Sequence, residues 1–249
     1  MPPFEWDDSN ALRADDMRSL SGSGRTSRGA PISPATPVVF VVDDDVSVRE
    51  SLEALIRWAG WQPETFSSAQ DFLSRPRDET PSCLVLDVEL PDLNGLDVQE
   101  RVAADRTEMP IIFITGHGDI PMSVRAMKAG AAEFLTKPFE RDVLLDAIRR
   151  AIERSRVALL QAAELRMLQE RFASLTPRER EVLAWVVSGL LNKQVGAELS
   201  MTEATVKAHR GQVMQKMKAD SLADLVRIAA RLELPLPSRS SGLPAGPQP

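Results

Sequence analysis

The chain of 249 residues has little of what covalent cross-links and membrane spans require. It contains one cysteine, Cys83, so no intrachain disulfide can form. No apolar run approaches the roughly 18 residues of a transmembrane helix, which predicts that the chain does not span a membrane. The first residues lack the basic and apolar regions of a signal peptide, so we expect a cytoplasmic protein. With 43% hydrophobic residues, the chain can form one or two domains with their own cores.

The composition changes along the chain. Residues 1–37 are rich in Ser, Gly, Pro and Arg without apolar periodicity, which predicts a disordered arm, and residues 235–249 predict a disordered tail. Residues 38–152 carry 21 acidic and 12 basic side chains, whereas residues 172–234 carry 7 acidic and 9 basic ones. An acidic region followed by a mildly basic one is compatible with a regulatory domain joined to a DNA-binding domain.

Four short apolar runs in the acidic region each lead into a polar residue. Such runs, with helical patterns between them, are typical of buried strands in a parallel βαβ sheet. Ligands of open parallel sheets bind beyond the carboxyl ends of the strands, so the residues after these runs are expected to meet in one crevice. These residues are Asp43, Asp44 and Asp45 after 38–42, Asp87 after 83–86, Thr115 after 111–114, and Lys137 after 133–136.

Helix capping is the alternative explanation for each of these residues taken alone, because Asp and Thr oxygens accept bonds from free backbone N–H groups. Capping has no use for a lysine at the last of the four positions. An acidic cluster, a hydroxyl and a lysine indicate instead a divalent cation beside an acceptor carboxylate. Mg²⁺ prefers oxygen ligands, and a metal and an ammonium stabilise a phosphoryl group in transfer. Since no P-loop is present, the phosphoryl group is expected to come from another protein or a small phosphodonor.

Residues 38–152 resemble the receiver domain of a bacterial two-component response regulator, through VVDDD (41–45), LDVELPDLNG (86–95), ITGHGD (114–119) and FLTKPF (134–139). The resemblance implies a doubly wound α/β fold of the flavodoxin-like type with a parallel sheet of five strands. It also implies a sensor histidine kinase as donor and a bound Mg²⁺. By this resemblance Asp87 is the phosphoacceptor, and Mg²⁺ is bound by Asp44, Asp87, the carbonyl of Glu89 and, through water, Asp43. Thr115 and Lys137 contact the phosphoryl oxygens, and Thr115 and Phe134 form the switch. The peptide between Lys137 and Pro138 is implied to be cis.

The rest of the chain has a helical pattern. Residues 140–174 contain no Gly or Pro and repeat apolar residues at helical spacing, so the last receiver helix is predicted to continue through a linker at 153–171. Thr176 and Pro177, followed by Glu179, predict a helix start. Further helices are predicted at about 192–199, from Thr202 and from near Ser221. Two helices joined by a tight turn, at about Asn192 to Gly211, indicate a helix-turn-helix.

The stretch from Leu175 to Val226 resembles the LuxR-type DNA-binding domain, which implies a small all-α domain at 172–234. With the receiver, this implies a response regulator of the FixJ/NarL-like family. On the predicted recognition helix, 203–218, one sector should pack inward, and His209 lies in it as a packing residue rather than a ligand. Lys207 and Arg210 are expected to provide specificity together with DNA shape, Gly211 to provide no readout, and Lys193 and Thr205 to contact phosphates.

The combined interpretation is a transcriptional regulator that binds double-stranded DNA as a dimer after phosphorylation, with RNA polymerase as a further partner. It is expected to have no enzymatic turnover beyond slow self-dephosphorylation. Two other readings stay open. Phosphatases that work through an aspartyl-phosphate share the Asp-rich strand ends, but usually carry a second Asp where Glu89 stands. The other open reading is a scaffold protein that is controlled by phosphorylation but does not bind DNA. Lys207 and Arg210 argue against this reading.

Overall fold

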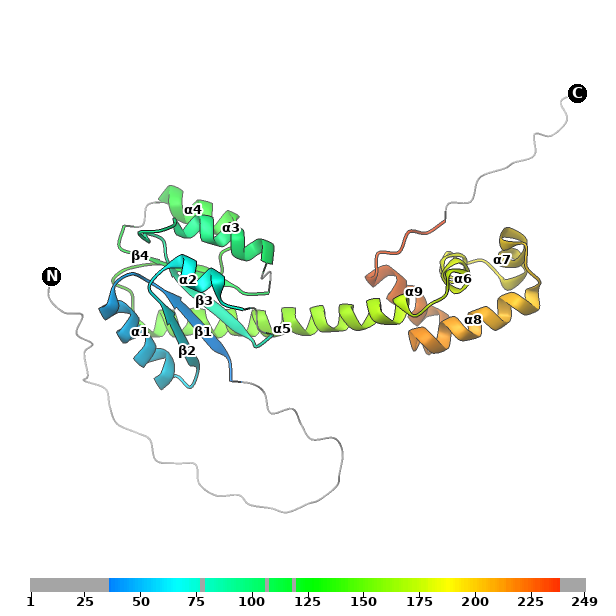
Figure 1. The fold of residues 1–249 in the computed structure, drawn as a ribbon, viewed down its shortest axis with the longest axis horizontal. Helices are drawn as coiled ribbons and strands as arrows, with labels where there is room; N and C mark the ends of the chain where they lie inside the picture. Colours follow the sequence, from blue (N-terminus) through cyan, green and yellow to red (C-terminus); the bar gives the residue numbers. More distant parts are fainter. Residues whose placement is uncertain (1–35, 77–78, 106–107, 118–119, 238–249) are drawn as a thin grey trace, which may run out of the picture. The chain divides into compact units, whose positions relative to one another are not determined.

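The structure of the protein is a computed structural model, and the residues it describes are 36–76, 79–105, 108–117 and 120–237. The chain divides into two compact units, Met1–Leu159 and Leu160–Pro249 (Figure 1). The predicted arm at 1–37 and tail at 235–249 lie almost entirely outside the described residues. The unit boundary falls within the stretch predicted as a helical linker.

The first unit contains, among its described residues, a parallel sheet of five strands in the order β2-β1-β3-β4-β5. The order reverses at β1, so the predicted doubly wound fold is confirmed. The apolar runs indicated four of these strands and missed β2, whose sequence QPETF is polar. Proline is tolerated there because β2 is an edge strand. The strands are β1 (Val38–Val42), β2 (Gln62–Phe66), β3 (Ser82–Asp87), β4 (Ile111–Thr115) and β5 (Glu133–Thr136).

Helices cover both faces of the sheet (Figure 1). On one face α1 (Val46–Trp58) and α5 (Arg141–Ala173) enclose a core with alternate strand residues such as Val85 and Ile112. Burial on both faces explains why β1, β3 and β4 read as continuous apolar runs. Cys83 is buried as predicted, and burial raises the pKa of its thiol. The other face carries α2 (Ala69–Ser74), α3 (Gly95–Asp105) and α4 (Ile120–Lys128).

Helix α5 is continuous over 33 residues, which confirms the predicted extension of the last receiver helix. Its first half packs on the sheet, where the Ser155 hydroxyl accepts a hydrogen bond from the backbone N–H of Ser82 at 3.1 Å. Leu168, near its end, belongs to the core of the second unit. Among the described residues, no helix combines the length and the apolarity needed to cross a membrane.

The second unit contains α6 (Pro177–Val187), α7 (Asn192–Leu199), α8 (Glu203–Met217) and α9 (Leu222–Arg231). The predicted helix starts at Thr176, at Thr202 and near Ser221 are confirmed, and the side chains of these three residues accept hydrogen bonds from backbone N–H groups of their own helices. Helix α8 ends one residue earlier than predicted, because Lys218 adopts the left-handed conformation that closes it. Side chains of all four helices, together with Leu168 of α5, form the core.

The turn between α7 and α8 depends on a glycine. A Cβ atom on Gly196 would lie 2.7 Å from the carbonyl oxygen of Met201, which is closer than real Cβ contacts allow. The backbone of α7 therefore approaches the segment that leads into α8 as tightly as a helix-turn-helix requires. Valine at 206 fills the space beside this contact.

An ion pair between the buried Glu179 and the partly buried Lys216 joins the start of α6 to the end of α8. The carboxylate of Glu179, 5% exposed, accepts hydrogen bonds from Lys216 Nζ at 2.7 Å and from the backbone N–H of Thr176 at 2.8 Å. These two bonds hold the pKa of Glu179 below its ordinary value. The link orients α8 with respect to α6, because each charge has its partner on the other helix.

Replacing Glu179 with alanine should lower the free energy of unfolding of the second unit by about 1–3 kcal/mol, because Lys216 and the Thr176 N–H lose their acceptor. Glu181→Ala is the matched control, since Glu181 pairs with Arg178 on the exposed side of the same helix at 2.7 Å. Such an exposed pair contributes about 0–1 kcal/mol. Hydrogen exchange of the α6 and α8 amides in the full chain measures both changes, and equal protection in the two variants would contradict the prediction.

The same link has a pH dependence. A carboxylate whose pKa falls on folding stabilises the fold above its unfolded value of about 4.3, and this contribution is lost as the pH falls through the folded value. The difference in hydrogen-exchange protection between the wild type and Glu179→Ala should therefore be present at neutral pH and become smaller below a pH of about 4.

Candidate functional sites

The carboxyl ends of β1 and β3 form an acidic pocket. Oxygen atoms of Asp43, Asp44 and Asp87 all lie within 4.8 Å of one another. Asp43 and Asp87 are buried, whereas Asp44 is exposed, so the pocket opens to solvent on the Asp44 side. Three carboxylates at this spacing match the oxygen ligands that a hard divalent cation such as Mg²⁺ takes, and leave room for water in its shell.

Lys137, directly after β5, reaches into this pocket. Its Nζ donates hydrogen bonds to Oδ2 of Asp43 and Oδ2 of Asp87, both at 2.7 Å. Burial raises the pKa of Asp43, and this effect outweighs the opposing influence of Lys137. Burial alone would lower the pKa of Lys137, but its bonds to Asp43 and Asp87 outweigh that effect and raise it, so the lysine stays charged.

Two further residues predicted for the site lie at the same edge of the sheet. Thr115 ends β4 and is fully buried, its hydroxyl accepts a hydrogen bond from the backbone N–H of His117 at 3.1 Å, and its carbonyl accepts one from the Lys137 N–H at 2.7 Å. The peptide between Lys137 and Pro138 is cis, as the resemblance implied. Phe134, on β5, is partly buried with its ring 6.2 Å from that of Phe113.

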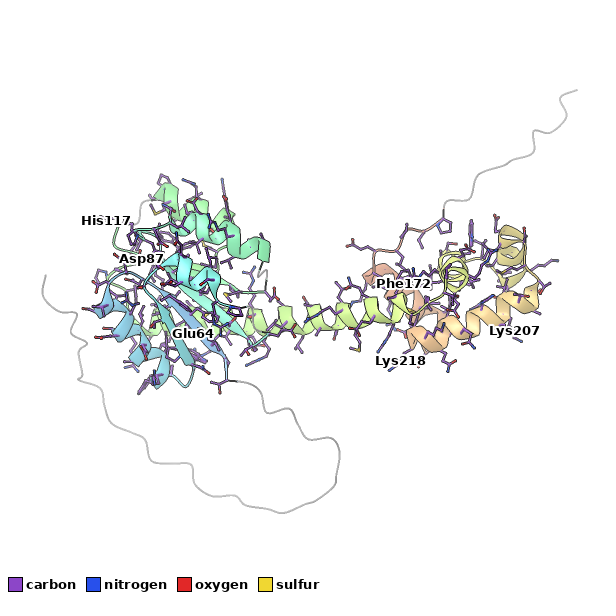
Figure 2. The ribbon with its side chains drawn as sticks, viewed as in Figure 1. Glu64, Asp87, His117, Phe172, Lys207 and Lys218 are labelled. Atoms are coloured by element: carbon purple, nitrogen blue, oxygen red, sulfur yellow. The ribbon has the colours of Figure 1, made fainter. Side chains whose placement is uncertain are left out.

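The loop after β3 wraps around the Asp87 carboxylate. The backbone N–H of Glu89 donates to Asp87 Oδ1 at 3.0 Å, and Glu89 pairs with Asn94 across the loop. The Glu89 side chain lies 3.4 Å from His117 Nδ1, in an exposed pair. Figure 2 shows Asp87 and His117 at the same end of the sheet.

Three supporting residues were not predicted from the sequence. A Cβ atom on Gly95 would lie 2.8 Å from the carbonyl oxygen of Asp87, so only glycine lets α3 begin this close to the acceptor. Arg49 Nη1 donates to the carbonyl of Asp43 at 2.7 Å, and the Asp92 carboxylate accepts from the backbone of Gln70 at 3.0 Å. Gly95 lies in the LDVELPDLNG stretch, but no sequence pattern shows which backbone it touches.

Helix α8 presents the predicted surface in the second unit. Val206, Val213 and Met217 are buried and His209 is partly buried, which confirms the inward sector. Lys207 and Lys218 lie towards opposite ends of the helix (Figure 2). The exposed residues predicted for DNA contact are Lys193, Thr205 and Lys207. Arg210, in contrast, is partly buried, and its Nη1 donates to Oδ1 of Asn192 at 3.1 Å.

An acidic pocket at the switch point of a doubly wound sheet, followed by a helix-turn-helix unit, defines a class of DNA-binding regulators with a receiver-type domain. The comparisons agree with this class. Residues 39–149 match the response regulator receiver domain, and residues 173–229 match the bacterial regulatory proteins of the LuxR family.

Several relatives combine both domains over nearly their full length. Nodulation protein W of Bradyrhizobium diazoefficiens is 51% identical over 195 residues, covering 78% of this chain and 86% of that protein. The transcriptional regulatory protein FixJ of the same organism is 41% identical, covering 78% and 94%. The solved structure of the response regulator StyR is 49% identical with a TM-score of 0.71, covering 79% of this chain and 100% of that one. The chain therefore belongs to the two-component response regulators of the FixJ/NarL-like family.

Replacing Asp44 with alanine should raise the dissociation constant for Mg²⁺ at least about tenfold, because the pocket loses one of its three carboxylates. Asp45→Ser is the matched control: Asp45 caps α1 by accepting from the Ser47 N–H at 2.8 Å, and serine retains that function. Calorimetric titration of the full chain with MgCl₂ measures both constants. Equal affinity of Asp44→Ala and wild type would refute the role of Asp44.

Proposed function

We propose that this phosphorylation-dependent DNA-binding transcriptional regulator accepts its phosphoryl group on Asp87. The observation that carries the proposal is the pair of 2.7 Å bonds from Lys137 Nζ to Asp43 and Asp87, beside a cluster of three carboxylates. A carboxylate at the end of a strand, with an ammonium at one oxygen and an open side towards solvent, can be approached by a phosphodonor. A bound Mg²⁺ would offset the negative charge of the incoming group.

The transfer itself needs little from the protein beyond position and charge. An oxygen of Asp87 attacks the phosphorus of a phosphohistidine on a sensor kinase, the P–N bond breaks, and the imidazole leaves. Lys137 exchanges its bond to Asp87 for one to a phosphoryl oxygen, and the buried hydroxyl of Thr115 donates to another. Asp44, Asp87 and the carbonyl of Glu89 would hold the metal, with Asp43 acting through water. A kinase partner and a DNA target together imply that the protein acts in the cytoplasm.

The consequence of phosphorylation is proposed to be dimerisation. Recruitment of Thr115 leaves space into which Phe134 can turn, and Phe134 lies on β5, which forms one face of the unit together with α4 and the start of α5. That face carries exposed apolar side chains, Val124 at 43%, Met127 at 46% and Val143 at 45%. Phosphorylation favours the dimer by the difference in its contacts between the two states. The two recognition helices of the dimer then bind a DNA site whose halves are related by two-fold symmetry. RNA polymerase is a further partner at this site.

The two other readings are less well supported. An aspartyl-phosphate phosphatase usually carries a second Asp two residues after the acceptor, where this chain has Glu89, so we propose no turnover beyond slow self-dephosphorylation. A scaffold without DNA binding does not account for the LuxR-family match or for the exposed Lys207.

Replacing Asp87 with asparagine should abolish labelling by acetyl phosphate, because the amide is not a nucleophile for phosphorus. Asp97→Asn, which neutralises an exposed carboxylate in the first turn of α3, should label like the wild type. Intact mass measured before and after hydroxylamine treatment identifies the acyl phosphate. Labelling of Asp87→Asn at the wild-type level would assign the acceptor to another residue.

Acetyl phosphate with Mg²⁺ should raise the dimer population of the wild type, and Met127→Glu should prevent this without reducing labelling, since a charge would be buried in the interface. Val157→Glu, which changes an exposed valine later on α5, should dimerise normally. Sedimentation velocity gives the populations, and fluorescence anisotropy gives the DNA affinity. A monomer at every level of phosphorylation, with unchanged DNA affinity, would rule out the mechanism.

A further inference from the structure

Arg210 differs in its surroundings from Lys207 on the same recognition helix. Lys207 is exposed, whereas Arg210 is partly buried and bonded to Asn192. Asn192 is the first residue of α7, so the bond spans the two helices of the helix-turn-helix. A guanidinium has five N–H donors, and within the described part of the chain Arg210 uses one of them, at Nη1, which leaves the others for a ligand.

The direction of this bond decides which part of DNA the guanidinium meets. In a helix-turn-helix the second helix enters the major groove, while the first crosses the sugar-phosphate backbone. A side chain that reaches from α8 to the first turn of α7 therefore lies beside the backbone. At 100° per residue, Lys207 and Gly211 lie on one exposed sector of α8, and Arg210 lies at its edge towards the buried Val206.

We infer that Asn192 is a positioning residue that holds Arg210 against a DNA phosphate, so that base reading on α8 rests on Lys207 without Arg210. The inference rests on the DNA binding described above and changes the role that the sequence suggested for Arg210. It makes Arg210 a contributor to affinity for every DNA sequence, because phosphate contacts carry no direct sequence information.

The chemistry of the tether suits this role. The Asn192 amide is neutral, so the bond fixes the long side chain without cancelling its charge. Ordering a flexible side chain before binding reduces the entropy that binding must remove. A carboxylate at position 192 would hold the guanidinium equally well but would neutralise it, and this difference separates a positioning role from a merely structural one.

The test uses the phosphorylated full chain, a duplex selected by the wild type from a random library, and an unselected duplex of the same length. Arg210→Ala should weaken binding to both duplexes by the same factor and reduce the slope of log K against log salt by about 1. Lys207→Ala should weaken binding to the selected duplex more than to the unselected one. Loss of discrimination in Arg210→Ala would overturn the inference, because it would make Arg210 a base reader.

Asn192 is tested in the same assay. Asn192→Ala should weaken binding several-fold in the wild-type background and have no effect in the Arg210→Ala background, because it acts through Arg210. Asn192→Asp should weaken binding at least as much as Asn192→Ala while the melting temperature is kept. An equal effect of Asn192→Ala in both backgrounds would refute the positioning role. Failure of the wild type to enrich any duplex would instead contradict the DNA-binding function itself.

Discussion

The first unit depends on the compensation of negative charge at the ends of β1 and β3. Asp43 and Asp87 are both buried, and two carboxylates this close repel each other in a medium that screens poorly. Lys137 bonds to both carboxylates and offsets their repulsion, so that both can stay buried in the folded unit. The sheet order places these three residues together, because β1 and β3 are neighbours and the Lys137 backbone is bonded to the end of β4. A phosphoryl group and a cation would change this balance, which is why chemistry here can alter the state of the whole unit.

The second unit uses charge in two different ways. Glu179 and Lys216 neutralise each other at a buried position and orient α8 against α6. Arg210 is instead held by the neutral Asn192, which leaves its charge available. The contrast follows from the surroundings: a charge inside the core requires an opposite charge, whereas a charge that is to meet a phosphate must stay uncompensated until the phosphate arrives.

Much of the fold could be read from the sequence because local rules determine it. Strands buried on both faces show as apolar runs, and Thr176, Thr202 and Ser221 cap helices within their own turn, so β1, β3, β4 and the helix starts of the second unit were predicted correctly. Strand β2 could not be predicted from an apolar run because its sequence is polar, and an edge strand needs no continuous apolar sequence. The end of α8 was placed one residue late, because nothing local distinguishes a lysine that closes a helix from one that continues it.

For the sites, the sequence by itself determined which residues end or directly follow four of the strands: Asp43, Asp44, Asp87, Thr115 and Lys137. That was sufficient to indicate a phosphoryl site, because parallel strands end at a common edge. Only the tertiary structure decided which backbone Gly95 approaches and which partners Arg49 and Arg210 bond. These contacts join residues that lie on different elements, and each contact is about as long as a hydrogen bond. Helix and strand periodicity states which face a residue occupies, but the partner on that face is set by how the elements pack.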